Sequence, residues 1–255
     1  PHSAWCMSTV DLAVIGNGMV CALLDGCGRY VWCCMDNVDG DAVFNCLINN
    51  NSHQTGFFDV VLEDFDHAEQ TYSENTMVLI TVLHSALGDS IEIRDFSPRF
   101  EHFDRLFRPI QFFRTIRRIR GDPRITIRVR PTFLFNSTDG YKTRGSQHVR
   151  YCGPSTTWRL TTNTATRHIV EELPFLLPLD PIYIVWGTDE SFTNSLPHVA
   201  EDFESKTIGY WRTWCRSLCL SVEFQEEVVR AAMTMVVLQS EDCGGGVVGP
   251  PISFA

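Results

Sequence analysis

Lysine is nearly absent from this chain of 255 residues, in which Lys142 and Lys206 are the only two. Arginine therefore carries almost all of the positive charge. The acidic residues outnumber the basic ones, and the formal net charge is −10. A surface that binds nucleic-acid phosphates needs a basic balance, so this composition argues against nucleic acid as a partner.

Several other features are missing. No apolar run is long enough to span a bilayer, and the N-terminal residues lack the basic region and apolar stretch of a signal peptide. We therefore expect no membrane association and an intracellular, cytoplasmic protein. The ten cysteines include no C-x-x-C pair, and no Cys/His spacing matches a zinc site. We expect no metal and, because the triple glycine at 244–246 follows a helix rather than opening one, no phosphate-bearing cofactor.

Most of the chain has the pattern of short β-strands separated by Gly, Asn and Asp turns. Strands of this length at this spacing predict a mainly β fold built on a large antiparallel β-sandwich. Residues 41–48 are expected to form a short helix or turn. The expected strands are residues 12–15, 20–24, 30–34, 57–63, 71–73, 77–85, 90–95, 112–120, 124–135, 158–162, 169–173 and 182–187.

Seven arginines cluster between Arg114 and Arg130. They could form a patch for anions or polynucleotides, or they could lie on the solvated faces of two paired strands. From Ile125 to Arg130 apolar and polar residues alternate strictly, which is typical of a half-buried strand and favours the second interpretation. The Gly121-Asp122-Pro123 turn predicts a hairpin between these two strands.

The pattern changes near residue 190. We expect a sandwich domain over residues 1–190, a linker helix region over 191–221, and a further helix and loop over 222–255. Tyr210, Trp211 and Trp214 in the linker helix are expected to pack back onto the sandwich. The helix from Val222 to Gln239 is apolar on most sides, so it needs neighbours on most sides. It predicts a contact with another domain or another protein chain.

The order of these motifs resembles glycoside hydrolase family 15 proteins of the bacterial glucoamylase and trehalase type. In two places the sequence departs from the family pattern. Gly16-Asn17-Gly18-Met19-Val20 stands where the family has GDGRT, and Asp36-Asn37-Val38-Asp39 stands where it has PRFD. The segments that carry the resemblance are residues 11–18, 22–26, 31–34, 93–98, 112–135, 210–214, 228–238 and 247–255.

The resemblance implies a β-sandwich, then a linker helix, then an (α/α)6 barrel that carries the chemistry. That chemistry is inverting hydrolysis of an α-glucosidic bond by two carboxyl groups, one acting as acid and one activating water. In the family both carboxyl groups lie beyond the segment that corresponds to residue 255, so no catalytic residue is assigned to this chain. The resemblance thus implies a non-catalytic N-terminal sandwich domain that scaffolds a catalytic barrel. The alternative is a stand-alone carbohydrate-binding module, or a structural and interaction module within a larger assembly.

One local group of residues could contact a sugar. Trp32 is followed closely by Asp36 and Asp39, and an aromatic ring beside carboxylates suits an α-glucoside. The other interpretation is a turn rich in Asp and Asn, which favour turns through local hydrogen bonds. The second interpretation is favoured, and Trp32, Asp36 and Asp39 remain the candidate substrate-binding residues.

Overall fold

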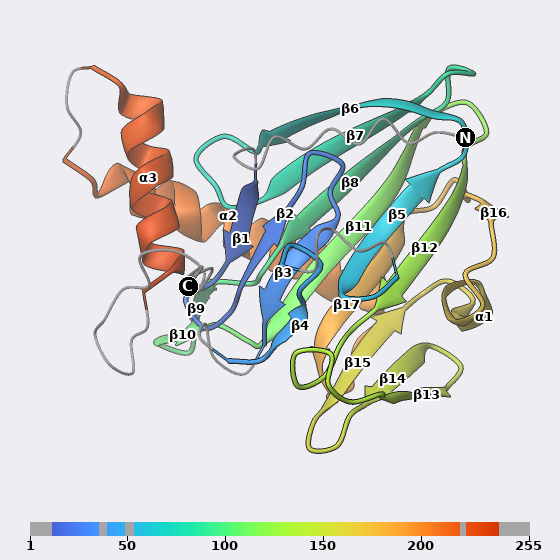
Figure 1. Ribbon diagram of the computed structural model, residues 1–255. Coiled ribbons are helices and arrows are strands. Elements are labelled where there is room, and N and C mark those ends of the chain that lie inside the picture. Colours follow the sequence, from blue (N-terminus) through green and yellow to red (C-terminus); the bar gives the residue numbers. More distant parts are fainter. Residues whose placement is uncertain (1–11, 36–39, 49–53, 220–222, 240–255) are drawn as a thin grey trace.

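Two antiparallel sheets lie face to face and make up most of the structure, a computed structural model that describes residues 12–35, 40–48, 54–219 and 223–239 (Figure 1). The predicted fold class is confirmed: a large antiparallel β-sandwich is followed by a long helix and then by one further helix. None of the helices among these residues is long and apolar enough to cross a membrane.

The first sheet has seven strands. Along its main path every neighbouring pair is antiparallel, and the short β4 pairs with β3 beside that path. In spatial order the strands are β1 (Ala13–Gly16), β2 (Cys21–Leu24), β3 (Tyr30–Cys34), β5 (Phe57–Leu62), β12 (Arg124–Arg130) and β16 (Phe175–Leu176), with β4 (Ala42–Phe44) on β3.

The second sheet has eight strands, and a separate hairpin of β9 (Phe100–His102) and β10 (Arg105–Phe107) projects beyond it. Its strands are also antiparallel throughout. In spatial order they are β13 (Tyr141–Arg144), β14 (His148–Cys152), β15 (Thr157–Thr162), β17 (Ile182–Thr188), β11 (Gln111–Arg120), β8 (Ser90–Phe96), β7 (Leu79–Ser85) and β6 (Phe65–Tyr72).

Alternate residues of both sheets meet in one apolar core. Strand β12 shows why: Ile125, Ile127 and Val129 are buried while the residues between them are not, as the alternation in the sequence predicts. Aromatic rings fill the middle of this layer, where Tyr30 stacks on Phe58 with ring centroids 5.3 Å apart. The two inner faces thus supply the burial that holds the sandwich together.

Two local predictions are wrong, and a third is correct in part. Gly121-Asp122-Pro123 does not join a hairpin, because β11 pairs with β8 and β17 in the second sheet while β12 pairs with β5 and β16 in the first. The turn instead carries the chain from one sheet to the other. Residues 41–48, expected as a short helix or turn, contain the strand β4 and then a turn at residues 46–48. Residues 169–173, expected as a strand, form the end of the short helix α1 (Thr166–Val170) and the turn after it, and Ile169 is buried in the core.

The arginine cluster is not uniformly solvated either. The side chains of Arg114 and Asp95 have no solvent exposure, and Arg114 Nε donates a hydrogen bond of 2.7 Å to Asp95 Oδ1. The Arg114 guanidinium lies over the rings of Tyr30 and Phe58, at 4.7 and 4.5 Å. This ion pair crosses between β11 and β8 and is part of the core rather than of an anion-binding surface.

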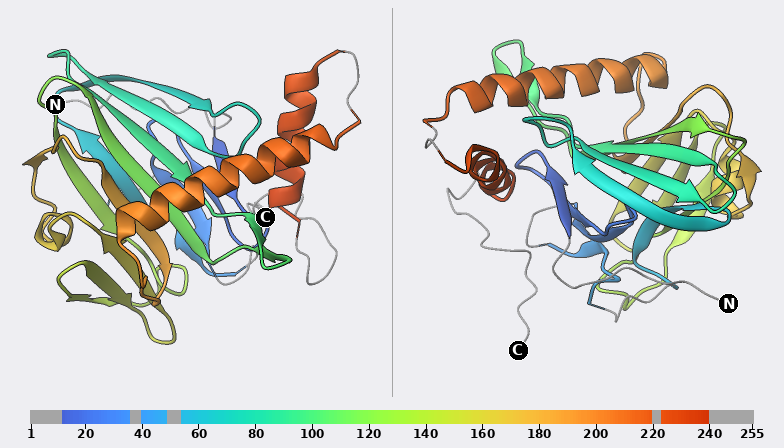
Figure 2. Two further views of the ribbon diagram at one scale, coloured as in Figure 1. Left: turned by 180° about the vertical axis from the view of Figure 1, so that it is seen from behind. Right: turned by 90° about the horizontal axis from the view of Figure 1, so that it is seen from above.

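Two helices follow the sandwich. Helix α2 (Leu196–Arg216) crosses the outer face of the second sheet, and helix α3 (Gln225–Val237) lies beyond the end of the sandwich beside β1 (Figure 2). Val199 and Ala200 of α2 are buried on Phe113, Tyr183 and Val185 of the sheet. Hence α2 is packed on the sandwich for most of its length and carries the chain to α3.

Candidate docking site at one end of the sandwich

The turn between β1 and β2 is fixed by the side chain of Asn17, which is fully buried. Its Nδ2 donates to the carbonyl oxygens of Pro98 (3.0 Å) and Pro109 (2.8 Å), and its Oδ1 accepts from the backbone N–H groups of Met19 and Val20. Both Nδ2 hydrogens and the Oδ1 of this amide therefore have hydrogen-bond partners inside the protein. Asn17 joins the β1–β2 turn to the segments before β9 and before β11.

Arg99 adds a second link at the same place. Its Nη1 donates to the carbonyl oxygen of Asn17, and its guanidinium faces the rings of Tyr210 (5.2 Å) and Trp211 (5.6 Å) on α2. Its backbone N–H donates to Thr207 Oγ1. A cation held against aromatic faces in a desolvated place is attractive, so Arg99 ties the β1–β2 turn to α2.

Polar contacts fasten the rest of α2 to the second sheet. Arg94 on β8 forms a 2.9 Å ion pair with the buried Glu204. Tyr183 on β17 donates a hydrogen bond to Glu201. Burial, and then this carboxylate, raise the pKa of Tyr183 to about 12, so the phenol keeps its proton and its donor role at neutral pH.

The three aromatic residues expected to pack on the sandwich lie at the end of α2. Trp211 has no exposed surface and contacts a cluster that includes Cys21 of β2 and Met77. Tyr210 and Trp214 are half-buried and flank it, with their rings edge-on to that of Trp211. Together with Gly16 and Cys215, the residues Cys21, Met77 and Trp211 form a surface that we call the α3 seat.

Helix α3 is closely fitted to this seat. Val229, Met233 and Val237 are buried, and they share one face of the helix because they are spaced by four residues. Gly16 makes the close approach possible: a Cβ atom at this position would lie 2.4 Å from Val237 Cγ1 and 2.4 Å from the Val20 carbonyl oxygen. A side chain here would therefore force Val237 or the Val20 backbone to shift.

A charged residue completes the contact. The Arg230 guanidinium carbon lies 3.6 Å from the centroid of the Tyr72 ring, and Nη1 donates to the carbonyl oxygen of Thr76 at 2.9 Å. Tyr72 Oη in turn donates to the carbonyl oxygen of Val14 and accepts from its N–H. Burial lowers the pKa of Arg230 and raises that of Tyr72. These contacts clamp α3 to both sheets, since Val14 is on β1 and Tyr72 on β6.

The opposite face of α3 is apolar and exposed. Phe224 is 71% exposed and Met235 66% exposed, and Val228 and Ala231 lie between them at helical spacing. We call these four residues the exposed stripe. The described part of the helix expected from Val222 to Gln239 is thus covered on one face only. Val222 itself lies outside the described residues.

The candidate sugar contact is not assembled among the described residues. Asp36 and Asp39 lie outside them. Trp32 is 2% exposed and packs with Cys34 and Ala42, so its ring presents no face to a sugar in this arrangement. The neighbouring Asp41 caps the backbone N–H groups of Leu134 and Phe135, a structural role of the kind expected for a turn.

The residues that make the cation–ring contacts beside the α3 seat were not identifiable from the sequence. Arg99, Arg230 and Tyr72 act through partners far away in the chain, and nothing in their own neighbourhoods marks them. The aromatic residues at the end of α2 were the only local signal. Side chains able to hold a metal lie elsewhere, on β6 and β7.

Two known proteins are similar to this chain, and no family model matches it. It is 24% identical over 261 residues to the "Trehalase" of Thermoplasma volcanium, covering 94% of this chain and 39% of that protein. It is also 24% identical over 244 residues to the "Trehalase" of Thermoplasma acidophilum, covering 88% and 39%. The chain is therefore related to a region of archaeal trehalases, and it spans about two fifths of their length.

Proposed function

We propose that this chain is the non-catalytic sandwich region of a family-15-like α-glucoside hydrolase of the trehalase type, and that it positions a catalytic (α/α)6 barrel. The similarity to two trehalases supports the glycosidase relationship. The resemblance of the motifs to glycoside hydrolase family 15 supports the finer assignment, in which α3 corresponds to the first barrel helix.

The α3 seat is the observation that carries this proposal. Three of the segments with the family-15 resemblance are distant in sequence and meet at or beside it: the β1–β2 turn, the residues that follow β8, and the end of α2. Asn17, where the sequence departs from the family pattern, has a structural role, because its side chain links two of these segments. The motifs thus serve to hold α3 rather than to surround a substrate.

The exposed stripe is the surface on which we expect the barrel to dock. An exposed apolar helix face that continues over three turns is typical of an interaction surface. The proposed occupant is the remainder of the barrel, because α3 buries one face on the sandwich and a barrel helix needs a second apolar face towards its neighbours. About three fifths of each relative lies outside the match, which is long enough for such a domain.

The pairing of two buried carboxylates supports the proposed lack of catalysis in this chain. Inverting hydrolysis needs an acid and a base on opposite sides of the scissile bond, with space for a water. Asp59 is paired with Arg29 and Arg128, and Asp95 with Arg114. Both carboxylates are held by arginine side chains inside the sandwich, so neither is free to act as that acid or base.

The test is an assay of the purified chain on trehalose, maltose and an aryl α-glucoside. We expect no release of glucose or aglycone above a buffer control. Turnover that is abolished by Asp36→Asn or Asp39→Asn would contradict the proposal and would place a catalytic site in the loop after Trp32.

A second candidate function is a stand-alone carbohydrate-binding module. A pocket of about 230 Å³ beside β13 favours it, because an exposed tyrosine ring, Tyr141, lies there with Asn136, Asp139 and Lys142. Stacking on an aromatic ring with polar groups around it suits a sugar. Binding of trehalose or maltose to the chain, lost in Tyr141→Ala, would support this alternative. Binding unchanged by that substitution would count against it.

A further inference from the structure

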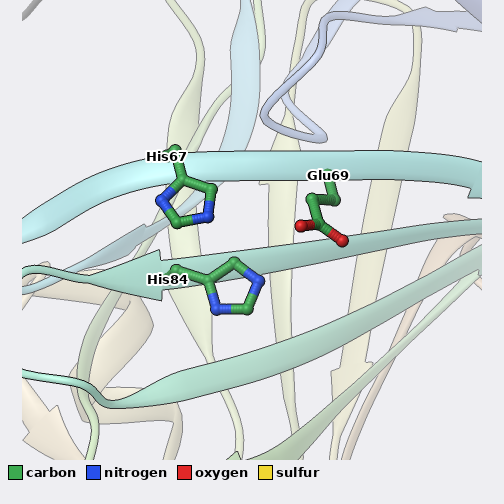
Figure 3. A group of neighbouring side chains, drawn as sticks. All are labelled: His67, Glu69 and His84. Carbon is green, nitrogen blue, oxygen red and sulfur yellow. The ribbon is translucent and has the colours of Figure 1, made fainter.

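Three potential metal ligands meet on the outer face of the second sheet. His67 on β6 is paired directly with His84 on β7, and Glu69 follows His67 by two residues on the same strand. Side chains two apart on a strand share a face. Figure 3 shows the two imidazoles and the carboxylate gathered over these strands, and their ligand atoms lie within 4.8 Å of one another.

The hydrogen bonds of the histidines leave the same nitrogen available on each ring. His67 Nδ1 lies 2.8 Å from Asp66 Oδ2, and because a carboxylate only accepts, this nitrogen carries the hydrogen. His84 Nδ1 lies 2.9 Å from Ser90 Oγ. Outer hydrogen bonds of this kind fix the ring orientation of metal-binding histidines. They leave Nε2 of each ring as the free ligand atom.

These nitrogens are directed at the carboxylate. Figure 3 shows one nitrogen of each ring on the side of Glu69. His84 Nε2 is buried and has no hydrogen-bond partner among the described residues. A buried polar nitrogen without a partner is costly, so a ligand that accepts its lone pair would stabilise it.

We propose that His67, Glu69 and His84 bind a divalent transition-metal ion, for which Zn²⁺ fits the two imidazoles and one carboxylate best. Zinc takes such ligands at about 2.0–2.2 Å in tetrahedral geometry, which leaves a fourth position for water. The two rings are stacked, with centroids 4.5 Å apart and an angle of 15° between their planes. They must tilt towards the ion, and the broad χ2 torsion of histidine permits this.

The alternative to metal binding is that these polar residues protect an edge strand. Strand β6 is at the edge of its sheet, and polar side chains on edge strands prevent pairing with other chains. Edge protection needs polar side chains, but it does not require the Nε2 atoms of two histidines to lie close to one carboxylate. Sequence spacing misses the group because strand pairing, not proximity in the chain, brings His84 to His67.

The test is titration of the full chain, stripped with EDTA, with Zn²⁺ in a calorimeter. We expect one saturable site whose affinity falls at least tenfold in His67→Ala, Glu69→Gln and His84→Ala. Ser90→Ala should weaken binding by about tenfold, as loss of an outer hydrogen bond does. His198→Ala on α2 is the matched control and should bind like the unsubstituted chain.

Cobalt distinguishes this site from the cysteines. Co²⁺ bound to the same stripped chain should show ligand-field bands without a thiolate charge-transfer band, and His84→Ala should remove them. The proposal is overturned if the chain shows no saturable binding. It is equally overturned if the three ligand substitutions leave binding unchanged, or if the cobalt spectrum shows thiolate ligation.

Discussion

Arg230 on α3 lies with its guanidinium carbon 3.6 Å from the centre of the Tyr72 ring on β6, and Tyr72 in turn hydrogen-bonds to the backbone of Val14 on β1. One side-chain pair thus connects α3 to both sheets at the end where the sandwich closes. The predictions below test whether α3 belongs to the folded unit in this way.

The first prediction concerns Arg230. Arg230→Ala removes the contact with Tyr72 and the hydrogen bond to Thr76, and should lower the free energy of unfolding by about 1–2 kcal/mol. Arg212→Ala on α2 is the control, because Arg212 is exposed and its hydrogen bond within the described part of the chain is a long one, 3.5 Å from Nε to the carbonyl oxygen of Glu74. Its effect should stay within about 0.5 kcal/mol. Urea unfolding measures both, and equal effects would show that the Arg230 contact does not hold α3.

Gly16 and Gly209 provide a matched pair of glycine substitutions. Gly16→Ala should destabilise the protein by about 1–3 kcal/mol, because its Cβ would overlap both Val237 and the immobile Val20 carbonyl. A Cβ at Gly209, within α2, meets nothing within 4 Å, so Gly209→Ala should stabilise by about 0.5–1 kcal/mol through helix propensity. Thermal melts followed by circular dichroism show whether each substitution lowers or raises the stability. A neutral Gly16→Ala would mean that α3 is not seated on the β1–β2 turn.

The ion pair of the core gives a third prediction. Asp95→Ala leaves the Arg114 charge buried and unpaired and should cost about 3–5 kcal/mol. Glu63→Ala breaks the exposed pair with Arg124, whose side chains are more than half exposed, and should cost less than about 1 kcal/mol. Unfolding in guanidinium chloride compares the two. Similar small losses would indicate that water reaches Arg114.

The rate at which the Cys21 thiol is alkylated measures how well α3 buries it. Burial raises the pKa of Cys21 to about 12. The reactive thiolate forms only as the pH rises through the pKa, so at pH 8 a far smaller fraction of the Cys21 thiol is ionised than of an ordinary thiol. Cys21 should therefore resist alkylation at pH 8, while the exposed Cys219 reacts.

Truncation after Ser221 completes that experiment. Without α3, Cys21 should be alkylated at least tenfold faster, because its pKa falls towards the ordinary value. Cys33 lies in the central core between the sheets rather than in the cluster that contacts α3, and should stay protected in both forms. Mass spectrometry of the labelled peptides gives each rate. An unchanged rate at Cys21 would contradict its burial by α3.

The sequence was a good guide to the sandwich because period-two alternation is a local property. Strand β12 shows it, with Ile125, Ile127 and Val129 buried as the pattern predicts. The partner of a strand is not local. Gly121-Asp122-Pro123 looks like a hairpin turn, but the Asp122 N–H is bound by Asp89 of another loop, and the chain crosses to the other sheet.

The candidate sites show the same limit. The aromatic residues at the end of α2 could be identified as packing residues because they are dense and adjacent. Trp32 was named as a candidate sugar contact because of the acidic residues that follow it, although a turn was the favoured interpretation. Its ring packs with Cys34 and Ala42, and this packing depends on strand pairing that the local sequence does not show. Arg99 and Arg230 gave no signal, because a cation against a ring depends on which distant segments are brought together.

The most direct test of the account is sedimentation velocity of the full chain over a wide concentration range, beside a Phe224→Glu/Met235→Glu variant. If the exposed stripe is a docking surface without its occupant, the full chain should self-associate with rising concentration and bind an apolar dye. The variant should remain a monomer with little dye binding and an unchanged melting temperature. A full chain that stays monomeric at high concentration and binds no dye would contradict the proposal that α3 presents an uncovered face to a catalytic barrel.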